Sequence, residues 1–247
     1  MVSEETNEKV EMADSKGKKR MVSVNFTGKE LLNNEVFDTT KEAVAKEHNI
    51  YDPKRKFKAL TIILGEKELL PLVEKELETM KEGEERTVKL SAKSGFGERV
   101  PDLVRILPAK VFAEHKINPV QGLVINIGNA LGKVQSVSGG RVRVDFNHLL
   151  AGRELEYTVK VVKEITAPKE IAEKLFEKYY SRIPSVTKTI TENKLSVTLP
   201  KETLNGLENV NKSIANLAKE LGIEIVVTGV EKKETPKEEV INKEEKK

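Results

Sequence analysis

Hydrophobic and polar residues alternate over several short segments near the start of the chain. Val24 and Phe26 are separated by a polar residue, and this spacing of two predicts a strand with one buried face. A second strand-like segment, 36–40, follows a turn signal at Asn33-Asn34, and the short apolar segment 60–64 predicts a third strand. The polar stretch between them, 41–58, is expected to be a loop or a bulge insertion.

An amphipathic helix is predicted after the third of these strands. Leu70, Val73 and Leu77 recur at spacings of three and four, which places them on one face of a helix. Pro71 suits the first turn, where its missing N–H costs nothing, and Gly83 suits the exit. We therefore expect one helix lying across a sheet of short strands.

The pattern changes after residue 97. Short alternating segments around a Ser138-Gly139-Gly140 turn predict a small all-β unit. Alternation typical of the first sheet resumes at 155–161, so the β unit is expected to interrupt the first domain. Beyond Pro168, helix and strand patterns succeed each other and predict a further α+β domain. The predicted organisation is a disordered extension at 1–20, a first domain at 21–97 plus 149–166, an inserted all-β domain at 98–148, an α+β domain at 167–231 and a disordered charged tail at 232–247.

Composition excludes several classes of function. The 43 Lys and Arg residues nearly balance 40 Asp and Glu residues, for a net charge of +3, so a dedicated nucleic-acid binder is not expected. The chain has no cysteine and only three histidines, which favours neither a thiol nucleophile nor a metal site. There is no Walker-type loop, no apolar run long enough for a membrane helix and no apolar leader. We expect a cytoplasmic protein without metal or cofactor.

Five short motifs follow one another in the first domain: Val24–Gly28, Val36–Asp38, Leu64-Gly65, Met80–Glu84 and Gly95–Glu98. In this order they resemble the motifs of the FKBP-type peptidyl-prolyl cis-trans isomerase family. Phe146–Gly152 and the strand after it resemble the segment that closes the SlyD subgroup, in which an insert-in-flap domain with chaperone activity interrupts the isomerase domain. The 41–58 bulge, the insert and the appended domain are most similar to long archaeal members.

The resemblance implies a fold, an activity and a class of partner. The fold would be a half-open antiparallel sheet wrapped around a short helix, and the activity would be rotation about Xaa-Pro bonds in proline-containing or unfolded polypeptide clients. Rotation costs about 18–20 kcal/mol because the planar imide is stabilised by resonance. The twisted imide is less polar than the planar one, so an apolar, water-poor pocket favours it without a nucleophile or a metal.

The resemblance also implies which residues form this pocket. The backbone N–H of Leu70 would anchor a substrate carbonyl, and Asp38 would orient the peptide and carry the only charge in the pocket wall. The implied catalytic residues are Phe26, Phe37, Asp38, Phe96 and Tyr157, and the implied substrate-binding residues are Leu60, Leu69, Leu70 and Val73.

Other interpretations of the same residues stay open. The aromatic residues would pack in any core of this shape, Asp38 is also suited to capping a turn, and His148 is better suited to a structural hydrogen bond at the domain junction than to an acid–base pair with Asp145. Val73 stands where the family usually has Trp, and Phe96 where it usually has Tyr. Both departures predict weaker catalysis.

Two other functions compete with an isomerase that assists folding. One is a non-catalytic chaperone on a degenerate isomerase scaffold, which would keep binding clients after its pocket is mutated and would lose them when 98–148 is deleted. The other is a scaffolding protein that forms a dimer or docks through its C-terminal domain.

Overall fold

The computed structural model of the chain describes residues 19–127 and 130–230. Apart from residues 19 and 20, the predicted disordered extension at 1–20 and tail at 232–247 lie outside this range. The described residues form two compact units. One is Val22–Glu164, and the other combines residues 19–21 with residues 165–230. Every helix within the described part is too short or too polar to cross a membrane.

The first unit is built on a five-stranded sheet whose strands come from both sides of the inserted segment. The strand order is β2-β1-β9-β4, with β3 paired to β1. Because β9 follows the insert in sequence and lies between β1 and β4, the chain must return after the insert to complete the sheet. The strands are β1 (Met21–Glu30), β2 (Val36–Thr39), β3 (Leu60–Ile63), β4 (Glu85–Leu90) and β9 (Leu155–Ile165).

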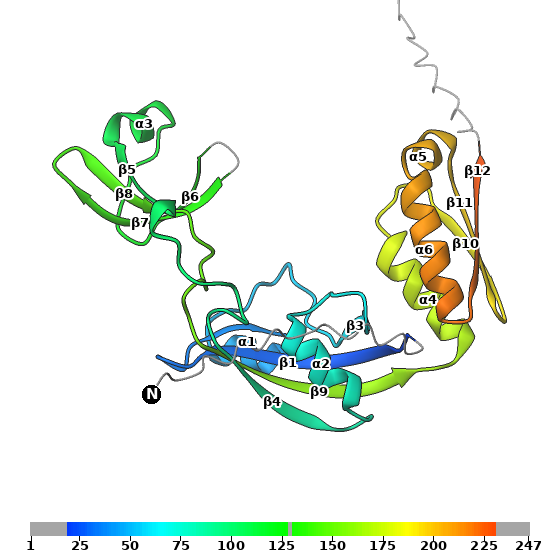
Figure 1. Cartoon of the computed structure of the whole chain (residues 1–247). Coiled ribbons are helices and arrows are strands. Elements are labelled where there is room, and N and C mark those ends of the chain that lie inside the picture. Colours follow the sequence, from blue (N-terminus) through cyan, green and yellow to red (C-terminus); the bar gives the residue numbers. More distant parts are fainter. Residues whose placement is uncertain (1–18, 128–129, 231–247) are drawn as a thin grey trace, which may run out of the picture. The chain divides into compact units, whose positions relative to one another are not determined.

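Helix α2 (Pro71–Thr79) lies across this sheet and supplies one side of its core (Figure 1). Pro71 occupies the first turn, and Val73 and Leu77 are buried against the strands, as the spacing of apolar residues predicts. Their partners are the buried side chains Val22, Val24, Ile62, Leu64, Met80, Leu90, Leu155, Val159 and Val161.

The stretch 41–58, expected to be a loop or a bulge, contains the short helix α1 (Glu42–Glu47). Ala45 on this helix is completely buried, and Glu42 pairs with Lys46 one turn later at 2.6 Å. The helix has only six residues, so the burial of Ala45 stabilises it more than its intrinsic helix propensity does.

The inserted segment has its own sheet and its own core. The strand order is β5-β8-β7-β6, and a helix, α3 (Ala109–Glu114), covers it with Phe112 fully buried. The prediction of an all-β insert is therefore wrong, because six residues are too few for a helical period to be visible in the sequence. The other elements are η1 (Pro101–Leu103), β5 (Val104–Pro108), β6 (Val124–Ile127), β7 (Ala130–Ser138) and β8 (Arg141–Asp145).

The second unit packs helices on one face of a three-stranded sheet ordered β10-β11-β12 (Figure 1). β11 pairs antiparallel with β10 and parallel with β12, and Leu195, Val197 and Leu199 alternate as its buried face. The chain as a whole is of the mixed α+β class with antiparallel strand pairs, as predicted. The elements of this unit are α4 (Pro168–Tyr179), β10 (Thr187–Thr191), β11 (Lys194–Pro200), α5 (Lys201–Gly206), α6 (Glu208–Glu220) and β12 (Glu224–Val230).

Candidate active site

An apolar cavity of about 290 Å³ lies between the sheet of the first unit and the start of α2. Its wall combines side chains from β1, β2, β9, the loop before α2 and the loop after β4, so no single segment of the chain defines it. Most of the lining is aliphatic or aromatic. The lining residues are Val24, Phe26, Asp38, Glu68, Leu69, Leu70, Val73, Phe96, Tyr157 and Val159.

Asp38 reaches the cavity because β2 is held tightly against β1. Gly28 pairs with Asp38 in the antiparallel register. The hydroxyl of Thr39 donates to the carbonyl of Phe26 at 3.0 Å, and the Phe26 N–H donates to the hydroxyl of Thr40 at 2.9 Å. These threonines are buried, and they hold Phe26 and Asp38 on the same side of the sheet. The alternation of hydrophobic residues gives no sign of this arrangement.

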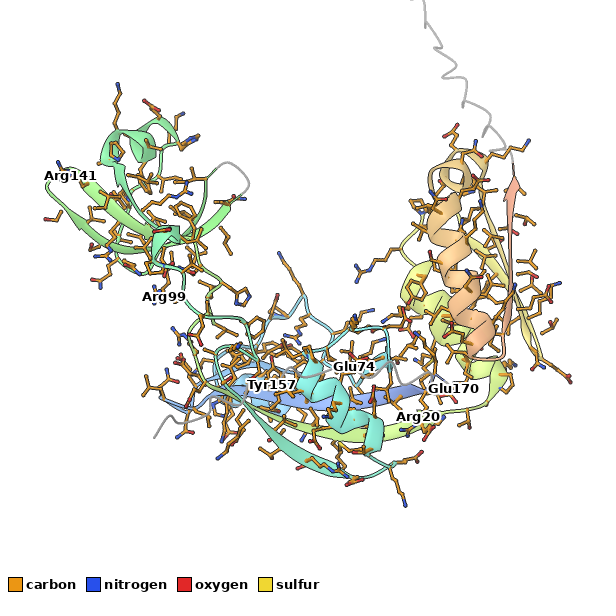
Figure 2. The ribbon with its side chains drawn as sticks, in the orientation of Figure 1. Arg20, Glu74, Arg99, Arg141, Tyr157 and Glu170 are labelled. Carbon is orange, nitrogen blue, oxygen red and sulfur yellow. The ribbon has the colours of Figure 1, made fainter. Side chains whose placement is uncertain are left out.

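Two aromatic rings, Phe26 and Tyr157, line the cavity on the sheet side, and a third, Phe37, packs against Tyr157. The ring of Phe37 meets Tyr157 edge-on at 5.6 Å, and Phe26 is tilted against Tyr157 at 6.2 Å. Burial, and to a smaller extent the negative charge of Asp38, raises the pKa of Tyr157 to about 12. The phenol is a hydrogen-bond donor beside Asp38 at neutral pH, and the raised pKa extends that state into alkaline solution. Figure 2 labels Tyr157 on β9, together with Glu74 on α2, which shapes the neighbouring loop.

The loop before α2 is shaped by a buried carboxylate, Glu74. Its Oε1 accepts the backbone N–H groups of Gly65 at 2.7 Å and Lys67 at 3.3 Å, which fixes the turn that leads to Leu70. Leu70 is the residue before the first turn of α2, and no described residue accepts its N–H. That donor is therefore available at the cavity wall.

Phe96 closes the cavity from the loop that precedes the insert. Its ring stacks face to face on His148, with centroids 4.3 Å apart and an interplanar angle of 6°. The Nδ1 atom of His148 accepts the Leu150 N–H at 3.2 Å. His148 thus makes a local structural hydrogen bond and supports an aromatic wall residue, while Asp145 has other partners.

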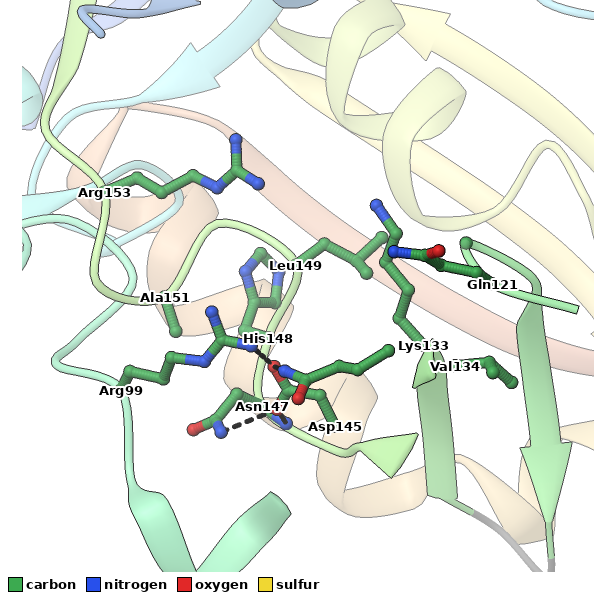
Figure 3. A pocket seen from close by; sticks show the side chains of 12 residues that line it. Arg99, Gln121, Lys133, Val134, Asp145, Asn147, His148, Leu149, Ala151 and Arg153 are labelled. Carbon is green, nitrogen blue, oxygen red and sulfur yellow. Dashed lines mark hydrogen bonds and ion pairs between the residues drawn. The ribbon is translucent and has the colours of Figure 1, made fainter. Parts of the chain in front are cut away.

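A second cavity, of about 380 Å³, lies where the two segments that join the insert to the sheet meet (Figure 3). Asp145 forms an ion pair with Arg99 and accepts from the side chains of Gln135 at 3.2 Å and Asn147 at 2.7 Å. Asn147 also makes two hydrogen bonds with the backbone of Val100. Most of the residues that line this cavity are charged or polar, so it is less suited than the first cavity to an apolar ligand group.

The structure brings together most of the residues implied by the family resemblance. Phe37 supports Tyr157 from behind the wall, and Leu60 lies at the exposed start of β3 outside the cavity. Glu68 lines the cavity, so the prediction that Asp38 carries the only charge there is wrong. Val24 and Val159 also line it and were not predicted, although their alternation with polar residues already marked them as buried.

Comparison with known proteins gives the same family. The FKBP26 IF-domain model matches residues 105–150. A short-type peptidyl-prolyl cis-trans isomerase of Methanocaldococcus jannaschii is 38% identical over 126 residues, which cover 51% of this chain and 80% of the relative. A SlyD protein of Vibrio cholerae, an FKBP-type isomerase, is 34% identical over 106 residues, or 42% of this chain and 53% of that protein.

A sheet crossed by one helix, with an apolar, aromatic cavity between them, has the form suited to a compact apolar group. The comparisons identify the class more closely, because a probable FKBP-type 16 kDa isomerase of Pseudomonas fluorescens is also 31% identical over 107 residues, or 70% of that protein. The chain belongs to the FKBP-type peptidyl-prolyl cis-trans isomerases. It is thus a peptidyl-prolyl cis-trans isomerase with an inserted segment of the FKBP26 type.

Proposed function

We propose that prolyl isomerisation takes place in the cavity between the sheet and α2. The observation that carries this proposal is the lining itself: an apolar enclosure with the Leu70 N–H, which no described residue accepts, at its wall. The proline ring enters among Phe26, Val73 and Phe96, and the Leu70 N–H holds a substrate carbonyl. In this environment the twisted imide is favoured over the planar one, which lowers the rotational barrier.

The chain's departures from its family have a physical consequence. Val73 fills less of the floor than a Trp side chain, and Phe96 has no hydroxyl to donate to the substrate. Both changes weaken contacts that hold the substrate, so modest catalysis is expected. A half-open antiparallel sheet around α2, the form expected for this family, leaves the mouth of such a cavity accessible to a polypeptide.

Asp38→Ala and Phe37→Ala test the location of the site. Each variant is expected to lower kcat/KM for an Xaa-Pro peptide by at least about tenfold, which corresponds to about 1.4 kcal/mol of transition-state stabilisation. The measurement is NMR exchange between the cis and trans forms, with circular dichroism to confirm folding. Asp102→Ala, at an exposed carboxylate of the insert, is the matched control. Full activity in both folded variants would place the chemistry elsewhere.

We also propose that the inserted segment, 98–148, binds unfolded clients. Ile106, Val124 and Leu131 are exposed at 64%, 45% and 56%, and each is adjacent to a core-facing residue in its strand. They therefore lie on the outer face of the β5-β8-β7-β6 sheet. Clients bound there raise the local concentration of prolyl bonds near the isomerase cavity.

Replacing these three residues by serine tests the role of the insert. The triple variant is expected to lose the ability to suppress aggregation of an unfolded client. Its kcat/KM for a short Xaa-Pro peptide should stay within about twofold of wild type, well below the tenfold change that corresponds to about 1.4 kcal/mol. Because the three side chains are exposed, the insert should remain folded. Undiminished suppression would rule this face out as the client-binding surface. A non-catalytic chaperone would instead suppress aggregation of the client without accelerating cis/trans isomerisation of the peptide.

From the sequence we further propose the domain boundaries given above, a cytoplasmic location and a dimer formed through residues 167–231. Sedimentation of the full chain over a range of concentrations tests the dimer, because a specific association shifts with concentration.

A further inference from the structure

Arg55 lies in the segment between α1 and β3, to which neither the motifs nor the comparisons assign a role. Its Nη1 donates to Oδ1 of Asp38 at 2.7 Å, and its Nη2 donates to the carbonyl oxygen of Thr39 at 3.0 Å. Asp38 is one of the two acidic residues that line the isomerase cavity. A cation from a distant part of the chain therefore covers a carboxylate of the substrate site.

Several contacts hold the guanidinium of Arg55 in this position. It lies over the ring of Phe57 at 5.2 Å, and that ring stacks on Tyr51 at 5.5 Å. The preceding turn is closed by Asp52, which accepts the N–H of Lys54 through its carboxylate at 2.8 Å and the N–H of Arg55 through its carbonyl at 3.0 Å. The backbone and the side chain of Arg55 are thus both fixed before a substrate arrives.

The ion pair is better explained by its effect on the cavity than by its effect on folding. The side chains of Arg55 and Asp38 are 42% and 38% exposed, and pairs this exposed contribute little to stability. Asp38, however, faces water on one side and an apolar cavity on the other, so its attraction for cations and repulsion of anions is screened less toward the cavity than toward the solvent. The guanidinium of Arg55, hydrogen-bonded to Asp38 at 2.7 Å, opposes this field.

We propose that Arg55 is a specificity-determining residue, which masks Asp38 so that the residue before the proline is selected for apolar character rather than for charge. The proposal rests on the proposed location of the isomerase site. Glu68, the other acidic lining residue, is the same in every variant below, so a change in charge preference reports on Asp38.

The test compares three peptides of the form Ala-Xaa-Pro-Phe, with Leu, Lys or Glu before the proline. In the full-length Arg55→Ala variant, the ratio of kcat/KM for the Lys peptide to that for the Glu peptide is expected to rise about tenfold, or 1.4 kcal/mol, and the Leu peptide to change little. The rise should shrink as salt is added, since exposed charges are screened. Lys54→Ala removes a neighbouring exposed charge and should leave the ratio unchanged.

Arg55→Lys is the conservative variant. Lysine keeps the positive charge but cannot hold the carboxylate and the Thr39 carbonyl with one planar fork, so the ratio is expected to return most of the way to wild type. A purely structural role would instead lower all three rates together in Arg55→Ala and would not be rescued by the charge.

Two outcomes overturn the inference. One is an unchanged Lys-to-Glu ratio in folded Arg55→Ala, and the other is an equal fall for all three peptides. Failure of the proposed site would look different, because Asp38→Ala would then leave every rate unchanged. With the site in place and the inference wrong, Asp38→Ala lowers the rates and Arg55→Ala does not alter the ratio.

Discussion

Gly28→Ala is expected to lower isomerase activity by at least about tenfold, or 1.4 kcal/mol of transition-state stabilisation. A Cβ at this position would lie 2.6 Å from Cζ of Phe37 and 3.1 Å from Cε1 of Tyr157. Real Cβ atoms essentially never come as close as 2.6 Å, so the Phe37 ring must move, and Tyr157 must shift by a few tenths of an ångström. Tyr157 lines the cavity and Phe37 supports it, so the wall on the sheet side is displaced. Overpacking of this kind also costs about 1–3 kcal/mol of stability. The measurements are peptide isomerisation by NMR exchange and the urea midpoint.

Two glycines of the same chain serve as controls for this variant. Gly206→Ala adds a methyl group with no atom within 4 Å and should leave both quantities unchanged. Gly132→Ala brings a Cβ to 2.7 Å from Val144 in the core of the insert, so it should destabilise the insert without slowing isomerisation of a short peptide. Normal kcat/KM in a folded Gly28→Ala variant would show that the Phe37–Tyr157 wall takes no part in catalysis.

Leu155→Ala is expected to lower the free energy of unfolding of the first unit by about 3 kcal/mol. Leu155 is completely buried and pairs in register with Leu90, which is also buried. It is the first residue of β9, the strand by which the chain re-enters the sheet after the insert. Its removal therefore leaves a cavity at the point where segments far apart in the sequence are joined.

Urea unfolding measures this loss of free energy, and hydrogen exchange of the β1, β4 and β9 amides shows whether it falls on this sheet. Leu32→Ala is the matched control, because Leu32 is 91% exposed and surface changes usually stay within about 0.5 kcal/mol. A loss below about 1 kcal/mol for Leu155→Ala would fall short of the usual cost of a buried leucine and would mean that the surrounding side chains collapse into the space.

The main strands and the helix α2 of the first unit could be predicted from the spacing of hydrophobic residues in the sequence. Val24 and Phe26 alternate with polar residues because successive side chains of a strand face opposite sides of the sheet. Val73 and Leu77 follow the period of a helix, and Pro71 marks its beginning. The order of short motifs around Asp38 and Phe96 was enough to predict the family.

Short helices were the part of the fold that the sequence did not reveal. α1 and α3 have six residues each, and helices of that length are not stable by propensity alone. Ala45 and Phe112 are buried by side chains from other segments, and that burial provides the stabilisation. Periodicity cannot predict an element whose stability comes from contacts made elsewhere in the chain.

The sequence by itself determined the family, the order of its main elements and most of the residues around the cavity, because these depend on hydrophobic spacing and on short local motifs. Only the tertiary structure decided that Arg55 covers Asp38, that His148 supports Phe96, that Glu68 lines the cavity and that Leu60 does not. Each of these facts depends on how separate segments are brought together in space. The physical reason is that a side chain's contacts are set by the packing of the whole unit, which no local pattern records.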